Sequence, residues 1–140
     1  MNILKIMTLA GLGAGMMACA SSKQKVEVVS LTGRWDIVAV AGCDSVTAEC
    51  EPFIDFAEGG SLNGCAGCNR LLGNYVADTV KQTLSFGQVG STRMMCRDMR
   101  TEDAVLEAMG KVRAYRMEDG NLMLTDDEGK TVLTLKKTAK

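Results

Sequence analysis

The residues of this sequence that could carry out chemistry are its cysteines. Cys65 and Cys68 lie close together in the glycine-rich segment 64–75. Further thiols are offered by Cys43, Cys50 and Cys96. Closely spaced thiols can form a redox site, bind a metal ion or form disulfide bonds. Which of these applies depends on the compartment to which the chain is sent.

The composition excludes several classes of function. The chain has 140 residues, 17 of them acidic and 16 basic, and it contains no histidine. The charge balance leaves no strong field to attract nucleic acid. Without histidine, Ser-His-Asp and Cys-His nucleophiles and imidazole-containing zinc sites cannot form. Once a leader is subtracted, the length predicts a single domain of about 110–120 residues.

The N-terminus predicts the compartment. Residues 1–18 have one early lysine and then an apolar run that is too short for a permanent membrane helix, as in a signal peptide. Ala18-Cys19 and the polar tether 19–30 resemble the lipobox of bacterial lipoproteins. The resemblance implies cleavage before Cys19 and its acylation, for example with palmitate, which would anchor the protein to a membrane. The alternative is ordinary secretion, although Met16 fits that cleavage rule poorly.

The rest of the chain, residues 31–137, predicts short strands and one helix. In 31–40, Trp35, Ile37 and Ala39 alternate as on a half-buried strand. Residues 42–51 have no apolar period and form a loop that Cys43 and Cys50 could close with a disulfide. Further strands are predicted as a hairpin over 53–62, then at 69–76 and 82–86.

The C-terminal part holds the predicted helix, at 101–110, with Thr101 as its cap and Gly110 as its end. Strands at 112–117, 122–125 and 132–135 follow as an antiparallel meander, and Asp126-Asp127 is assigned to a turn. The fold class is therefore mainly β (α+β). We expect an antiparallel curled sheet or barrel of about six to eight strands with one helix packed on it.

Several spaced motifs resemble one known family. They are Leu31-x-Gly33-x-Trp35, Pro52-x-Ile54-x-Phe56, Gly67-Cys68-Asn69 followed by Gly73-x-Tyr75, Thr92-x-Met94-Met95-Cys96, and Gly120-x-Leu122-x-Leu124. This pattern, which spans about residues 31–136, is similar to the META domain of heat-inducible HslJ-type proteins. The resemblance implies a small β-rich envelope protein with links to stress response, to novobiocin tolerance and, in some parasites, to virulence. It implies no chemical mechanism.

The resemblance also bears on the thiols. Cys68 and Cys96 occupy family positions, so we expect them to form one disulfide. We expect Cys43 and Cys50 to form another, leaving Cys65 as the free thiol. Cys65 could instead take the place of Cys68 or of a loop cysteine, and the sequence leaves these pairings open.

The functional expectation is a non-enzymatic lipoprotein of unknown activity with a structural or binding role. It would be a monomer in the cell envelope, held by its lipid to the outer membrane and facing the periplasm. It would bind no nucleic acid, cofactor or metal, and the sequence does not identify an envelope protein partner. The main alternative is a periplasmic thiol oxidoreductase that uses Cys65 and Cys68. Two less favoured alternatives are zinc bound by four of the cysteines and Cu(I) bound by methionines.

Overall fold

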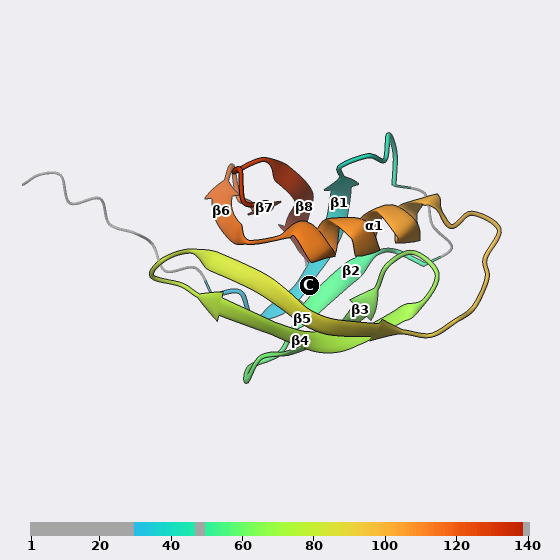
Figure 1. Ribbon diagram of the computed structural model, residues 1–140, viewed down its shortest axis with the longest axis horizontal. Helices are drawn as coiled ribbons and strands as arrows, with labels where there is room; N and C mark the ends of the chain where they lie inside the picture. Colours follow the sequence, from blue (N-terminus) through green and yellow to red (C-terminus); the bar gives the residue numbers. More distant parts are fainter. Residues whose placement is uncertain (1–29, 47–49, 139–140) are drawn as a thin grey trace, which may run out of the picture.

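The computed structural model describes residues 30–46 and 50–138, so Cys19 and the predicted signal peptide lie outside the described residues. The domain is a closed antiparallel barrel in which each strand pairs with its neighbour in sequence and β1 pairs with β8 (Figure 1). The strands are β1 (Gly33–Val40), β2 (Phe53–Phe56), β3 (Ser61–Cys65), β4 (Arg70–Asp78), β5 (Thr83–Ser91), β6 (Ala114–Glu118), β7 (Asn121–Thr125) and β8 (Thr131–Lys137). The predicted barrel-like fold is thus confirmed.

The barrel interior is filled by alternate residues of the strands. Phe56 of β2, Leu71 of β4, Leu124 of β7 and Leu135 of β8 are fully buried. Such alternation is what a strand with one buried face requires. In β1 it holds for Trp35 and Ile37, but a register shift between Ile37 and Ala39 exposes Ala39. The prediction that Ala39 shares their face is therefore wrong, since a bulge reverses the side-chain direction.

The single helix of the described residues, α1 (Arg100–Lys111), packs against β1, β5 and β8 through a stripe of apolar residues. Val105, Ala108 and Met109 are buried in this stripe. Thr101 is not its cap: it is buried within the first turn, and the Oδ1 atom of Asp98 accepts a hydrogen bond from the Arg100 N–H instead. Within the described part of the chain, no helix has the length and apolarity needed to cross a membrane.

The barrel closes through a short seam between β5 and β6. These strands share one register pair, Thr83 with Ala114. Two backbone bonds extend the seam, from the Leu84 N–H to the Arg113 carbonyl and from the Tyr115 N–H to the Gln82 carbonyl. By contrast, β4 and β5 form a long hairpin that projects on one side of the molecule (Figure 1).

Candidate functional site around the start of helix α1

The five cysteines of the described chain gather near the N-terminal end of α1. Cys96 precedes the helix in sequence, and the backbone N–H of Cys68 donates to a carboxylate oxygen of Glu102 in the first helical turn, at 3.1 Å. Cys43 lies on the other side, with its sulfur 3.9 Å from the hydroxyl oxygen of Thr101. The fold therefore brings together all the thiols of the described chain that sequence reasoning singled out.

Four of these cysteines form two disulfide bonds. One joins Cys68 to Cys96, as expected. The other joins Cys50 to Cys65, so the expected Cys43–Cys50 bond and the expected free thiol at Cys65 are both wrong. The reason is that the N–H of Cys50 donates to the Gly67 carbonyl, which holds Cys50 against the segment that carries Cys65. Cys43 is the free cysteine of the described residues and is half-buried.

A buried carboxylate connects α1 to the loop between β3 and β4. Glu102 is only 3% exposed, and its Oε1 accepts hydrogen bonds from the N–H groups of Cys68 and Asn69, at 3.1 and 2.6 Å. Its Oε2 accepts from the side-chain amide of Asn69 at 2.6 Å. A buried carboxylate needs such donors, because an unpaired charge in the interior is costly. The sequence explains Glu102 only as favourable charge at the positive end of the helix, and no motif signals this contact.

Asn69 extends the same network to the loop that leads into α1. Its Oδ1 accepts from the Thr92 hydroxyl and from the Met94 N–H, both at 2.7 Å, and its amide donates to the Met94 carbonyl at 3.1 Å. The Thr92 hydroxyl oxygen in turn accepts from the Arg70 N–H. The motif residues Asn69, Thr92 and Met94 therefore hold two loops and the helix together, and the Met94 side chain itself is exposed.

Gly73 and Tyr75, the remaining part of the central motif, support the neighbouring sheet. The Tyr75 hydroxyl donates to the Ala57 carbonyl at 2.8 Å, and its ring meets Phe56 edge-on. Burial, with a smaller effect from Glu58, raises the pKa of Tyr75. A side chain at Gly73 would lie 2.7 Å from the carbonyl oxygen of Gln88, so β4 and β5 approach closely only because this residue is glycine.

The cysteines and methionines are not arranged as the oxidoreductase, zinc or Cu(I) hypotheses require. Cys65 and Cys68 are bonded to different partners and are both buried, so they do not form the dithiol that an oxidoreductase motif requires. The same bonds occupy four of the five cysteines considered for zinc. The methionines considered for Cu(I) are dispersed, since Met109 is in the core whereas Met95 is exposed.

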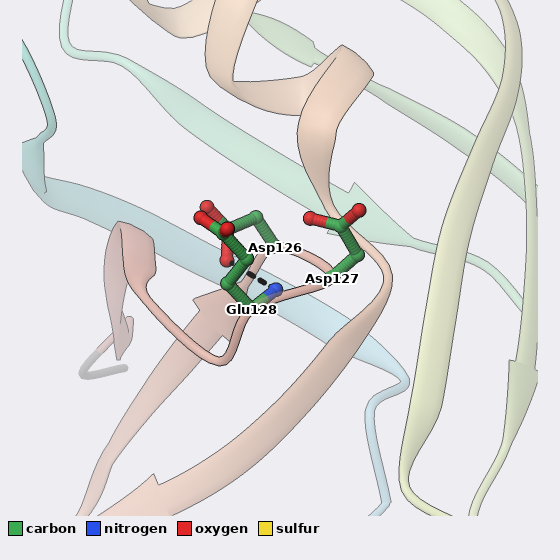
Figure 2. Close-up of side chains that lie close together, drawn as sticks. All are labelled: Asp126, Asp127 and Glu128. Atoms are coloured by element: carbon green, nitrogen blue, oxygen red, sulfur yellow. Dashed lines mark hydrogen bonds between the residues drawn. The ribbon is translucent and has the colours of Figure 1, made fainter.

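One group of carboxylates in the described residues is close enough to suggest a cation site. Asp126, Asp127 and Glu128 lie together in the turn between β7 and β8 (Figure 2). Oδ1 of Asp126 accepts from the N–H groups of Glu128 and Lys130, both at 2.9 Å, and the bond from Lys130 is the main reason that the pKa of Asp126 is lowered. These bonds are those of a turn, as the sequence predicted.

A half-open cleft of about 410 Å³ borders the free thiol. It is formed by Cys43 and the loop after β1 on one side, and by Arg100, Asp103 and Glu107 of α1 on the other. Arg100 pairs with Asp98 at 2.7 Å. The cleft thus presents one thiol between charged groups of both signs.

Several solved structures of other proteins have a similar fold. A solved structure from Burkholderia xenovorans has 23% identity and a TM-score of 0.61, covering 94% of this chain and all of its own. A DUF4847 family protein from Bacteroides vulgatus has 16% identity and a TM-score of 0.55, covering 83% of this chain and 99% of its own. A further NMR structure has 23% identity and a TM-score of 0.57, with 74% and 87% covered. At these sequence identities, the similarity shows a shared fold alone.

No curated protein matches the sequence. The model of the META domain family matches residues 28–139, a range that includes all of the described domain. Among the motif residues that suggested this family, Asn69 and Thr92 join the loops by hydrogen bonds, and Cys68 and Cys96 join them by a disulfide. The chain belongs to the META domain family.

Proposed function

We propose that the protein is a lipid-anchored META-domain protein of the bacterial cell envelope, with a binding or structural role that is not enzymatic. The observation that carries the proposal is the pair of disulfide bonds, Cys50–Cys65 and Cys68–Cys96. Disulfides persist in oxidising compartments such as the periplasm and are rare in the bacterial cytosol. The signal-like residues 1–18 and Cys19 supply a route to that compartment and an anchor in the outer membrane.

The contacts of Glu102, Asn69 and the cysteines support a role that is not enzymatic. Glu102 and Asn69 have the types that often act in catalysis, but here they bond to each other and to backbone groups. The close-spaced thiols fasten loops. These residues stabilise the domain, so its role would lie in the surfaces that it presents.

The anchor is tested by mass spectrometry of the membrane fraction without reduction. We expect a mature chain that begins at acylated Cys19 and retains both disulfides. A Cys19→Ser variant should leave the membrane fraction while keeping the two disulfides, which separates anchoring from folding. A wild-type chain cleaved after Ala18 and free of lipid would contradict the proposal.

The family resemblance supports a role in stress or antibiotic tolerance. Deletion of the gene in the native bacterium should lower tolerance of heat or novobiocin, and the wild-type chain should restore it. The Cys19→Ser variant should restore it less well if the anchored location matters. Equal restoration of tolerance by both chains would show that this role does not need the anchor.

A further inference from the structure

The turn between β4 and β5 presents an apolar residue to solvent. Val80 is 79% exposed at this turn, and Val76 is 72% exposed on the outer face of β4. The turn is held by Asp78, whose Oδ1 accepts from the N–H groups of Val80 and Lys81 at 2.9 and 3.1 Å. The carboxylate is therefore directed at the backbone, while Val80 and the exposed Lys81 project outward. Singly exposed apolar residues are normal on a protein surface, so the place of these valines relative to the predicted anchor is what suggests a contact.

The described chain begins beside this same hairpin. A shallow groove of about 580 Å³ is bordered by residues 30–32 on one side and by Val76, Ala77 and Thr79 on the other. In Figure 1, the start of β1 and the turn between β4 and β5 lie towards the same side of the molecule, away from the loop between β5 and α1. The described chain, to which the predicted tether 19–30 leads, therefore begins beside the exposed Val76 and near the turn that carries Val80.

The length of that segment limits how far the hairpin can lie from a membrane. About 11 residues separate Cys19 from Ser30, and a fully extended chain of this length spans about 36–40 Å. A flexible chain would have an average span of about 17–20 Å. A tether of this length, attached to a lipid at Cys19, would maintain a high local concentration of the hairpin at the bilayer surface.

We propose that the β4–β5 turn, with Val80 and Val76, is the membrane-facing contact of the domain and rests in the headgroup region of the bilayer to which Cys19 is attached. This inference rests on the proposed anchor. Lys81 would place its ammonium group among the phosphates while its stem follows the apolar contact. Because Glu58 lies close enough to Tyr75 to affect its pKa, the surroundings are not uniformly basic, and the contact would depend chiefly on the valines.

The test uses the acylated full-length chain in vesicles of phosphatidylcholine with a minor fraction of phosphatidylglycerol. Val80→Trp places a fluorescent probe at the turn, and Met95→Trp places a matched probe at an 85% exposed apolar position in the loop between β5 and α1. Both variants retain Trp35, which is 3% exposed, as a common background. Both also carry the same preference of tryptophan for membrane interfaces.

We expect the Val80→Trp probe to shift to the blue in vesicles and to be quenched at least about twofold more strongly than the Met95→Trp probe by lipids with a spin label near the headgroup. Equal quenching of the two probes would overturn the inference. A blue shift without quenching would also overturn it, because the turn would then be covered by protein. Acylation of Cys19 is measured on the same sample, so a chain without lipid refutes the anchor, whereas a lipidated chain with an unquenched turn refutes this contact alone.

Discussion

Glu102 is a charged side chain that the fold buries because three N–H donors surround it. Two come from the backbone of Cys68 and Asn69, and the third from the Asn69 side chain. Hydrogen bonds to a charged acceptor are stronger than neutral ones. Loss of this acceptor would leave buried donors without a partner, which costs more than the bonds themselves contribute.

Substitution of Glu102 by Gln should therefore lower the free energy of unfolding by about 1–3 kcal/mol. The new amide can accept the backbone N–H groups, but it directs a donor at the Asn69 amide. Urea unfolding measures the change. Glu107→Gln is the matched control on the same helix, because the Glu107 side chain is 72% exposed, and it should stay within about 0.5 kcal/mol of wild type. Equal effects would refute the assigned role of Glu102.

The thiols of the mature, non-reduced domain should differ in reactivity. We expect an alkylating reagent to label Cys43 and to leave Cys65 unlabelled, because Cys65 is bonded to Cys50. Peptide mass spectrometry identifies the labelled residue. A Cys43→Ser variant should show no labelling within residues 30–138, and label on Cys65 in the wild type would refute the assigned bond.

The two disulfides fasten loops to the body of the barrel. Cys68–Cys96 spans 28 residues and connects the loop after β3 to the loop before α1. Cys50–Cys65 spans 15 residues and connects the loop after β1 to the end of β3. In the chain-entropy account, the longer loop restricts the unfolded chain more.

The loss of stability when each bond is removed by a double Cys→Ser substitution should follow the same order. We expect a loss of about 3.6 kcal/mol for Cys68 with Cys96 and about 3.0 kcal/mol for Cys50 with Cys65. Denaturant unfolding of the two variants against the oxidised wild type provides the measurement. No loss of stability in the Cys68/Cys96 variant would show that the buried network of Glu102 holds the loops without the bond.

The elements themselves were largely predictable from the sequence, whereas their contacts were not. Periodicity located the strands and the helix because alternation and helical spacing are local properties. The partner of Cys50 depends on where the loop after β1 meets Gly67, which is a long-range contact that no local pattern encodes. For the same reason, the exposure of Ala39 followed from a bulge in its pairing with β8 and was not foreseen.

Tyr75 and Tyr115 should limit the stability of the whole domain at high pH. Burial raises both pKa values above the usual tyrosine value of about 10, with smaller effects from Glu58 on Tyr75 and from Asp78 on Tyr115. The folded state thus holds these phenol protons more tightly than the unfolded state. Their contribution is complete below the unfolded pKa of about 10 and is lost as the pH rises through the folded values.

We therefore expect the free energy of unfolding to fall above about pH 10. Tyr75→Phe should be less stable at neutral pH by about 1 kcal/mol, because it loses the bond to the Ala57 carbonyl, but its decline at high pH should be shallower. Urea unfolding on either side of pH 10 measures both effects, with Cys43 alkylated to prevent disulfide exchange. A decline as steep as in the wild type would exclude Tyr75 as a cause.

The short seam between β5 and β6 has a consequence for how the native protein fluctuates. Every other strand pair shares at least four register positions, whereas β5 and β6 share one. Local opening requires the fewest broken hydrogen bonds at this point, so the barrel should open there into a curved ribbon before it unfolds globally. The amide protons of Leu84 and Tyr115, which bridge the seam, should then exchange with solvent earlier than those between β7 and β8.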